Sequence, residues 1–477
     1  MNKVFVSSLS VYGLSILMPS YSAQIKENKK PNIIVVFTDD QGYQDLGCFG
    51  SPKIKTPSID QMASEGIRFT DFYVSASICS PSRASLLTGR IPARNGVGQV
   101  FFPDSKGMDS SEVTIAEVLK TVGYTTACFG KWHLGDFKSN LPTSQGFDTY
   151  FGIPYSNDMY IGVNQEFAVQ VNFRDGYTLE KAKSDQDFVK NSGKNGNKIK
   201  EHGIKELAPL FEGNKIVEYP ADQGTLTIRY FDHAMDFISR SGNAPFFVYI
   251  TPAMPHVPLF VSKQFAGTSE RGLYGDVVEE IDWNMGRLFK YLKDKGLDEN
   301  TIVIFTSDNG PWLGYDDHAG SAIPLRDGKF TQYEGGLRVP CVMRWPGKWA
   351  SGKVSPAITS TLDLLPTLAH YAGAKLPDKT LDGINIAKLL EDPKNNQGHE
   401  IFVYSKNTEI WGVRKGDWKY LPHGGARFAD KNSSPELYNL KEDISESTNL
   451  YSQYPEKAKE LSGIIKSYNQ TITKNEN

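Results

Sequence analysis

The sequence predicts an α/β protein with a large, mostly parallel mixed sheet sandwiched by helices, followed by a smaller C-terminal antiparallel sheet plus a helix. Continuous runs of β-branched and aromatic residues, typical of strands buried on both faces, alternate with segments of helical pattern. After Gly373 the pattern changes to short runs separated by turns, which is typical of an antiparallel sheet. We expect a signal peptide over residues 1–23, a main α/β domain over residues 24–375, and an α+β subdomain over residues 376–477.

Composition and the N-terminus limit the class of protein. The chain has 477 residues and a formal net charge of −3, which argues against a nucleic-acid-binding protein. Residues 1–23 combine Lys3, an apolar-leaning run and small residues, as in a secretory signal peptide cleaved after Ser22 or Ala23. No later stretch approaches the ~20 apolar residues of a membrane span. We therefore expect an exported protein, periplasmic or extracellular, with no membrane span.

Four predicted strands each end in polar residues. Because open α/β sheets place ligands beyond the carboxyl ends of their strands, we expect these polar residues to converge. The strand over residues 33–37 leads to Asp39 and Asp40, that over 125–129 to Lys131 and His133, that over 245–250 to His256, and that over 301–305 to Asp308 and Asn309.

Helix signals separate these strands. Pro57 opens a helix that ends at Gly66, and Thr114 with Glu117 forms a capping box for a helix over residues 115–122. Residues 276–295 carry one apolar face and predict a helix that packs on a sheet. Between residues 155 and 222 the pattern weakens, and lysine-rich residues 181–205 predict a mobile insertion that could contact an anionic polymer. Residues 67–74 predict one strand and residues 455–468 a closing helix.

A cysteine stands at the start of a further short helix. Ser80 and Pro81 predict the cap and first residue of this helix, and Gly89 its end. The helix N-terminus, with Arg83 one turn in, favours an anion beside Cys79, so an oxyanion substrate is the first hypothesis. The alternative is a buried structural cysteine. Cys48, Cys128 and Cys341 are expected to be buried thiols rather than parts of a disulfide framework.

The oxygen-bearing residues at the strand ends predict a cation site. Asp39, Asp40, Asp308 and Asn309 supply hard oxygen ligands without thiolate or imidazole, which suits Ca²⁺ or Mg²⁺ better than Zn²⁺.

The segment Cys79-Ser80-Pro81-Ser82-Arg83, followed by Leu86-Leu87-Thr88-Gly89-Arg90, resembles the signature of the formylglycine-dependent (type I) sulfatases of the alkaline phosphatase superfamily. The resemblance is strongest to the arylsulfatase A-like branch and covers nearly the whole mature chain. The other matching segments, in order, are Asp39-Asp40, Asp45-Leu46-Gly47-Cys48, Gly130-Lys131-Trp132-His133, His256, Asp308-Asn309-Gly310, Lys329, Glu334-Gly335-Gly336 and Glu436-Leu437-Tyr438-Asn439-Leu440.

The resemblance implies an activity and a set of residue roles. Residues 24–375 would be catalytic, and a formylglycine-generating maturation enzyme would convert Cys79 to formylglycine (3-oxoalanine), whose hydrate attacks sulfur. Asp39, Asp40, Cys79, Asp308 and Asn309 would surround a bound Ca²⁺, with Mg²⁺ as an alternative. Lys131 and Lys329 would offset charge on the sulfuryl oxygens, Arg83 would orient the hydrate, His256 would protonate the departing alcohol, and His133 would help expel sulfate.

Several alternatives stay open. A phosphonate monoester or phosphodiester hydrolase of the same superfamily shares much of this motif set, and a non-catalytic glycan-binding relative is a different class. An exported sulfatase suggests a sulfated carbohydrate substrate, a polysaccharide or glycosaminoglycan fragment, but the sequence selects neither the sugar, the sulfate position, endo or exo action, nor an oligomeric state. His318 could bind a sugar hydroxyl at the pocket mouth or simply satisfy a loop.

Overall fold

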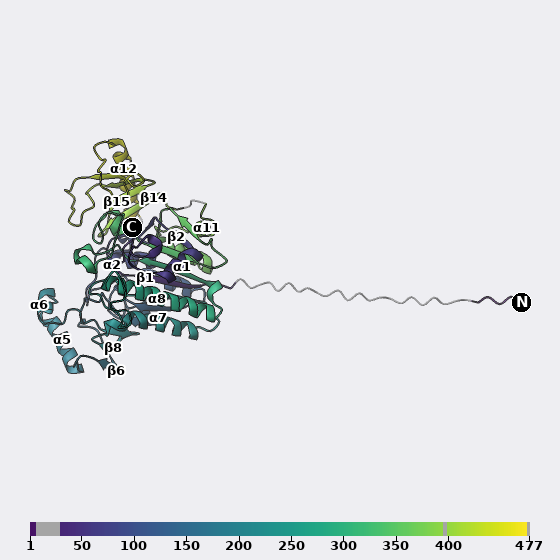
Figure 1. Cartoon of the computed structure of the whole chain (residues 1–477), viewed down its shortest axis with the longest axis horizontal. Helices are drawn as coiled ribbons and strands as arrows, with labels where there is room; N and C mark the ends of the chain where they lie inside the picture. Colours follow the sequence, from purple (N-terminus) through teal and green to yellow (C-terminus); the bar gives the residue numbers. More distant parts are fainter. Residues whose placement is uncertain (6–28, 395–397, 475–477) are drawn as a thin grey trace.

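The computed structural model describes residues 1–5, 29–394 and 398–474 and comprises a large α/β domain with a smaller C-terminal sheet (Figure 1). The predicted signal peptide falls mainly on residues 6–23, so that prediction lies outside the described residues. Within the described part of the chain, no helix has both the length and the apolar character that crossing a membrane requires. Cys48, Cys79, Cys128 and Cys341 are free thiols.

Four parallel strands form the centre of the large sheet, in the order β10 (Thr301–Ser307), β1 (Asn32–Thr38), β9 (Phe246–Thr251) and β4 (Thr125–Gly130). Val35 of β1 pairs with Ile304 on one side and Tyr249 on the other. Nearly every residue of these strands is buried, as expected for strands covered on both faces. The four runs predicted as buried strands are therefore confirmed.

Further strands extend this centre into a mixed sheet of 11 strands, in the order β12-β2-β11-β10-β1-β9-β4-β5-β7-β8-β6. Pairing is antiparallel at β10–β11, β11–β2, β5–β7 and β7–β8, and parallel elsewhere. The mostly parallel mixed sheet is thus confirmed. The added strands are β2 (Ile67–Phe69), β5 (Thr149–Gly152), β6 (Phe167–Phe173), β7 (Leu210–Glu212), β8 (Lys215–Tyr219), β11 (Cys341–Arg344) and β12 (Lys353–Ser355).

The single strand predicted over residues 67–74 is wrong. It divides into β2, which lies in the large sheet, and β3 (Phe72–Tyr73), which pairs with β13 (Thr359–Ser360) in a separate sheet. The backbone N–H of Thr70 donates to Ser355 O, and this contact lies where the chain leaves the large sheet. The break depends on pairing with a distant segment, so no local signal marks it.

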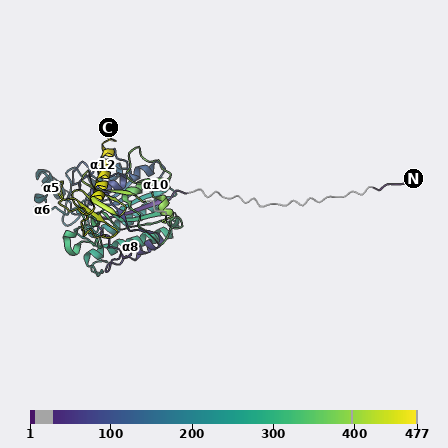
Figure 2. The ribbon, with the colours of Figure 1, turned by 90° about the horizontal axis from the view of Figure 1, so that it is seen from above.

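Helices cover both faces of the large sheet (Figures 1 and 2). One face carries α1 (Pro57–Glu65), α7 (Gln223–Arg240) and α8 (Leu273–Asp294), whose apolar stripes share one core with the sheet. The other carries α2 (Cys79–Thr88), α4 (Ile115–Lys120) and α10 (Leu364–Ala372). The predicted end of α1 before Gly66 and the Thr114–Glu117 capping box are confirmed, although α4 ends two residues early. Short helices are α3 (Pro92–Asn95), α9 (Glu334–Leu337) and α11 (Ala387–Glu391), with 3-10 turns η1 (Gly47–Phe49), η2 (Pro142–Ser144), η3 (Asp298–Asn300), η4 (Leu313–His318) and η5 (Thr361–Asp363).

The lysine-rich insertion has regular structure, which corrects the prediction of a mobile segment. It contains α5 (Leu179–Asn191) and α6 (Gly196–Glu201), which lie at one edge of the domain (Figure 1). Side chains of Thr178 and Asn195 cap their N-termini. A small core of Tyr160, Val189, Ile199 and Ile204 fixes them to the domain. Four apolar positions spread over 45 residues leave no clear period in the sequence.

The C-terminal part is an antiparallel sheet with a helix, as predicted. Its strands are β14 (Ile401–Lys406), β15 (Glu409–Lys415), β16 (Trp418–Leu421) and β17 (Glu436–Asn439), and α12 (Pro455–Lys474) packs on it. Its apolar side chains merge with the core on the α2 face of the large sheet. The boundary at residue 375 stays a prediction, because this core is continuous across it.

A buried charged network joins the two parts. Glu334 of α9 is fully buried and accepts from Lys419 Nζ of β16 at 2.9 Å and from the Tyr404 hydroxyl of β14 at 3.2 Å. Burial alone would raise the pKa of Glu334, but Lys419 and Arg338 hold it at about 2. Lys419 also contacts Glu446 at 2.8 Å. Because removing one member would leave a buried charge unpaired, this network fixes α9 to the C-terminal sheet.

A second link, between His399 and η5, predicts a pH-dependent contribution to stability. Nε2 of His399 lies 2.7 Å from Asp363 Oδ1. Burial alone would lower the pKa of His399, but Asp363, with Asp382 adding to its effect, raises it above 6.5. The stabilisation is therefore complete below the unfolded pKa and is lost as pH rises through the higher folded pKa. We expect His399→Gln to lower the free energy of unfolding by about 1.5–3 kcal/mol at about pH 5.5, and by less at about pH 9.

Urea unfolding at both pH values measures this difference. His370→Gln, on the exposed side of α10, is the matched control and should match the wild type at both. An equal loss for His399→Gln at the two pH values would contradict the role of the ion pair.

Candidate active site

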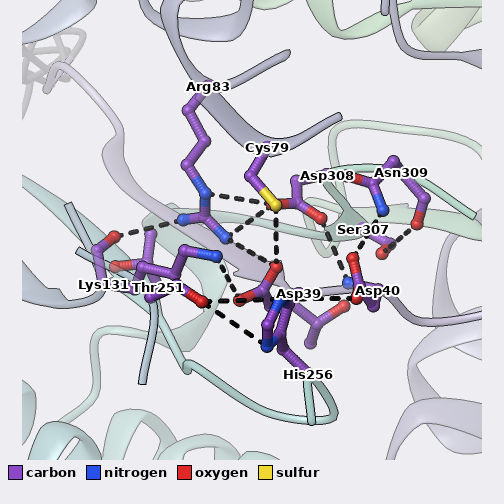
Figure 3. Close-up of polar contacts among 12 residues, drawn as sticks. Asp39, Asp40, Cys79, Arg83, Lys131, Thr251, His256, Ser307, Asp308 and Asn309 are labelled. Carbon is purple, nitrogen blue, oxygen red and sulfur yellow. Dashed lines mark hydrogen bonds and ion pairs between the residues drawn. The ribbon is translucent and has the colours of Figure 1, made fainter. Parts of the chain in front are cut away.

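The carboxyl ends of the central strands bring the predicted polar residues together (Figure 3). Asp39 and Asp40 follow β1, Asp308 and Asn309 follow β10, Lys131 follows β4, and His256 lies in the loop after β9. Asp308 N donates to Thr38 O and Lys131 N donates to Thr251 O, so the strand pairing continues into the loops. The structure therefore places these residues where the strand-end rule predicts.

Three carboxylates and one thiol form the middle of this cluster. Each of Asp39, Asp40, Cys79 and Asp308 offers a ligand atom, and these atoms lie within 4.8 Å of one another. All four residues are at most 3% exposed. Two unit charges at ~4 Å repel by about 4 kcal/mol at an intermediate dielectric, so this cluster requires cations.

Three cationic side chains balance the carboxylates. Lys131 Nζ lies 2.5 Å from Asp39, Lys329 Nζ 2.7 Å from Asp40, and Arg83 Nη2 2.8 Å from Asp308. Burial alone would raise the pKa of Asp39, but Lys131, His256 and Arg83 hold it well below its usual value. Burial and then the Asp39 charge raise the pKa of Asp308 to about 7. A further cation would stabilise the ionised form of all three carboxylates.

Helix α2 begins at Cys79, two residues earlier than predicted, because Ile78 rather than Ser80 occupies the N-cap position. Its predicted end at Gly89 is confirmed. All ten residues of α2 are buried. Cys79 Sγ lies 3.5 Å from Asp39 Oδ1 and accepts from Lys329 Nζ at 3.3 Å. Burial raises the pKa of the thiol, and Lys131 and Lys329 only partly oppose it. Burial therefore favours the neutral thiol over the thiolate, which is the nucleophilic form of cysteine.

Arg83 lies close to the thiol, and its guanidinium binds other partners. Nε and Nη2 donate to Asp308 Oδ2 at 3.0 and 2.8 Å, and Nη1 donates to Lys131 O at 3.1 Å. Arg83 thus fixes the Asp308 carboxylate and the start of the lysine loop. Its predicted role in orienting the hydrate stays a prediction.

The donor set fits a hard divalent cation. Asn309 Nδ2 donates to Asp40 Oδ1 at 2.7 Å, while the buried Asn309 Oδ1 has no hydrogen-bond partner among the described residues. A buried acceptor without a partner is costly, and a cation held by Asp39, Asp40, Asp308 and Asn309 would satisfy it. The structure thus contains a possible metal site formed by the predicted residues.

Lys329 owes its position to a close backbone contact. Lys329 N donates to Pro311 O at 2.9 Å, and Gly335 N donates to Arg326 O at 2.8 Å. A Cβ atom on Gly335 would lie 2.1 Å from Asp327 O, and one on Gly336 would lie 2.5 Å from Gly328 O. The two glycines after Glu334 therefore let α9 pack against the backbone that carries Lys329.

His256 is oriented so that Nε2 faces the cluster. Nδ1 lies 3.1 Å from Asn157 Oδ1 and 2.5 Å from Val257 O, and both are acceptors, so Nδ1 carries a proton. Nε2 lies 3.7 Å from Asp40 Oδ2. Burial, then the charge of Lys329, lowers the pKa of His256. Nε2 is therefore the atom that can exchange a proton with a bound substrate.

His133 is also buried near the cluster. Its Nε2 lies 3.0 Å from Phe101 O, and its Nδ1 has no partner among the described residues. Burial and the charges of Lys131 and Arg83 lower its pKa well below 6.5. His133 is thus neutral, with a proton on Nε2 and a lone pair on Nδ1.

His318 does not join the cluster. It ends η4 and is exposed to solvent, so its predicted contact with a sugar hydroxyl stays a prediction.

Two contacts of His256 were not predicted from the sequence. Asn157 Oδ1 accepts a hydrogen bond from His256 Nδ1, and the centroid of the Trp312 ring lies 5.9 Å from that of the His256 ring. Trp312 follows the Asp308-Asn309-Gly310 segment closely enough to be suspected, whereas Asn157 lies in a loop without a motif.

Fold and site together define a class of protein. A buried, cation-rich cluster at the strand ends of an α/β sheet contains a candidate nucleophile at a helix N-terminus, a possible metal site and a histidine placed for proton transfer. Such an arrangement binds a tetrahedral oxyanion and assists the departure of its alcohol. The protein is a hydrolase of oxyanion esters.

Comparison with known proteins identifies the family. The chain belongs to the sulfatase family, whose profile matches residues 31–374, and a second profile described as N-sulphoglucosamine sulphohydrolase, C-terminal, matches residues 326–474. Human arylsulfatase A is 38% identical over 460 residues, which cover 91% of this chain and 86% of that protein. The chain is therefore a sulfuric ester hydrolase similar to arylsulfatase A.

Solved structures agree with this assignment. PsFucS1 sulfatase from Pseudoalteromonas sp. aligns with a TM-score of 0.78 and 26% identity, covering 94% of this chain and 92% of that chain. Ps i-CgsB, solved in complex with k-i-k-neocarrahexaose, aligns with a TM-score of 0.74 and 29% identity, covering 92% and 93%. The similarity thus extends over both the large sheet and the C-terminal sheet.

The metal site predicts cation-dependent stability. We expect Ca²⁺ to raise the melting temperature of the protein, since a ligand at about 100 times its Kd stabilises the folded state by ~2.7 kcal/mol. Asn309→Ala would remove one of the expected oxygen ligands and should therefore weaken this response, so that about tenfold more Ca²⁺ is needed for the same stabilisation.

Thermal unfolding during a Ca²⁺ titration measures both effects. Asn284→Ala, another fully buried asparagine, on α8 away from the cluster, is the control. It should lower the melting temperature but keep the wild-type Ca²⁺ response. Identical Ca²⁺ responses in the two variants would argue against the site.

Proposed function

We propose that this enzyme hydrolyses sulfate esters of a carbohydrate, a polysaccharide or glycosaminoglycan fragment, after conversion of Cys79 to formylglycine and with Ca²⁺, or alternatively Mg²⁺, bound. The observation that supports the proposal most directly is the buried cluster of carboxylates and cations around Cys79, in which Sγ contacts both Asp39 and Lys329. The hydrated aldehyde supplies one hydroxyl to attack sulfur and a second to expel sulfate, whereas the neutral thiol offers neither.

The surrounding cations hold the sulfate group. Lys329 Nζ is 3.3 Å from Sγ and Lys131 Nζ is 2.5 Å from Asp39, so both ammonium groups face the position that the sulfuryl oxygens would take. A cation bound by Asp39, Asp40, Asp308 and Asn309 would add its charge at the same place. Fixed charges in a site closed to water stabilise the developing negative charge without reorganisation.

Two histidines divide the proton transfers. His256 Nε2 faces Asp40 and the nucleophile, which suits it to protonate the departing alcohol. His133 is buried and neutral, and its unpartnered Nδ1 can accept a proton when sulfate is expelled. The assignment gives each imidazole one role, set by which nitrogen is free.

Maturation and export complete the proposal. Cys79 is 1% exposed within a fully buried helix, so a formylglycine-generating enzyme would have to act on the chain before it folds. We propose that residues 1–23 direct export to the periplasm or the extracellular space.

Support for a carbohydrate substrate comes from the relative Ps i-CgsB, solved with a hexaose, and from the exposed lysines of α5 and α6. The family match favours sulfate esters over phosphonate esters.

Production with and without a maturation enzyme tests the nucleophile. We expect peptide mass spectrometry to find an aldehyde at position 79 only after co-production, and sulfate release from at least one sugar of a sulfated panel to follow the aldehyde content. Cys79→Ala should abolish release, while Cys341→Ala, a buried thiol in β11, should retain it. Equal turnover by the thiol form would refute the nucleophile, and turnover of phosphonates alone would refute the sulfatase.

The role of His256 predicts a dependence on the leaving group. A sugar alkoxide requires a proton to depart, whereas an activated phenolate departs without one, so His256→Ala should slow sugar sulfate hydrolysis by about 10²–10⁴-fold and aryl sulfate hydrolysis by much less. Rates on a sugar sulfate and on a nitrophenyl sulfate measure the contrast. His233→Ala, on α7 away from the cluster, is the control. A loss of the same size on both substrates would argue against proton donation.

A further inference from the structure

A small cavity beside the reacting cluster lies between the large domain and the C-terminal sheet. Its volume is about 180 Å³. Ile78, next to Cys79, and Phe330, next to Lys329, line it from the large domain, while Ser405 and Arg427 line it from the C-terminal part. A cavity of this size admits one substituent or one sugar ring rather than an oligosaccharide.

Two of the residues that line the cavity, Ser405 and Gln332, each have a buried polar atom without a hydrogen-bond partner among the described residues. Ser405 is 1% exposed and Gln332 is 2% exposed. Ser405 Oγ and Gln332 Oε1 have no hydrogen-bond partner among the described residues, although Gln332 Nε2 donates to Ser77 Oγ at 3.3 Å and so fixes the amide. Buried groups of this kind cost free energy unless a ligand or water satisfies them.

The rim of the cavity carries a cation that no carboxylate neutralises. The Arg427 guanidinium lies over the Phe330 ring, 4.2 Å from its centroid, and over Phe428 at 5.3 Å. Arg427 is exposed, and no ion pair of Arg427 occurs within residues 29–394 and 398–474. A guanidinium stacked on an aromatic ring is held in one plane and offers its fork of N–H donors to an oxyanion.

Lys406, the other cation that lines the cavity, already has hydrogen-bond partners within the protein. Its Nζ donates to Ala429 O at 2.5 Å and to Arg427 O at 3.4 Å, and it lies 4.5 Å from the Trp411 ring centroid. Lys406 therefore fixes the loop that carries Arg427, which makes it a positioning residue. Arg427 is the cation left to bind a ligand.

One aromatic ring connects this cavity to the reacting cluster. The Phe330 centroid lies 4.2 Å from Arg427 Cζ and 5.6 Å from Lys329 Nζ, and that Nζ is 3.3 Å from Cys79 Sγ. A sulfate group placed at Cys79 and a second anionic group placed at Arg427 would therefore both lie close to this one ring. Two such groups can belong to one sugar or to two adjacent sugars.

We propose that Arg427, stacked on Phe330 at this cavity, forms a subsite for a second anionic group of the substrate, so that the enzyme selects saccharides that carry a sulfate ester and another oxyanion. The subsite rests on the proposed function, since it positions the ester at Cys79. The second group is a carboxylate or a sulfate, because both match the guanidinium fork.

Equilibrium binding tests the subsite without turnover. In full-length protein carrying Cys79→Ala, calorimetry measures the Kd of three probes: N-acetylgalactosamine 6-sulfate, its disaccharide with an unsaturated uronate, and a disulfated N-acetylgalactosamine. We expect Arg427→Gln to weaken binding of the uronate disaccharide, the disulfated sugar or both by about tenfold to hundredfold, relative to its effect on the monosulfated sugar. Which probe responds identifies the carboxylate or the sulfate. Arg427→Lys should retain part of the preference, because it keeps the charge and loses the fork.

The matched control is Arg240→Gln, an exposed arginine of α7 paired with Asp236, which should leave all three Kd values unchanged. Equal weakening of all probes by Arg427→Gln, no weakening, or no binding of either doubly anionic probe would overturn the subsite. Sulfate release by the matured wild-type enzyme is measured in parallel. Its absence on every ester would overturn the proposed function, while the binding result would still decide the subsite.

Discussion

Burial of three carboxylates, those of Asp39, Asp40 and Asp308, within 4.8 Å of one another is the constraint on which the site depends. Parallel strands β1 and β10 deliver these carboxylates side by side because their last residues pair in register. Such a cluster is stable only with nearby cations, and Arg83, Lys131 and Lys329 supply them from α2, from the end of β4 and from the loop before α9. The chain segments around Cys79 are thus held together by the same charges to which we assign roles in the reaction.

The C-terminal sheet contributes to this balance although none of its residues reaches Cys79. Lys329 precedes α9, and α9 is fixed by the contacts of Glu334 with Lys419 and Tyr404. The same sheet contributes Ser405 and the loop of Arg427 to the wall beside the nucleophile. The smaller part therefore both supports the lysine beside Cys79 and lines the neighbouring cavity.

Most of the fold and the centre of the site could be predicted because their signals are local. The buried strands are continuous apolar runs, and Asp39, Asp308 and Lys131 follow them directly, so one rule about strand ends places them together. What could not be predicted depends on distant partners. The split of β2 from β3 depends on pairing with residues near 355. The position of helices α5 and α6 depends on a small core that their apolar residues share with Tyr160. The contact of Phe330 with Arg427 depends on how the two sheets pack together.

The ion pair between α9 and the C-terminal sheet also affects where two related sulfatases can be recombined. The family profile for the C-terminal region begins at residue 326, before Lys329, although the profile for the large domain continues to residue 374. A chimera joined near residue 375 would separate Glu334 from the Lys419 with which it is matched, whereas a junction just before residue 326 would carry both. Recombination among relatives is therefore expected to move Lys329 together with the C-terminal wall of the neighbouring cavity, so that the two are inherited as one unit.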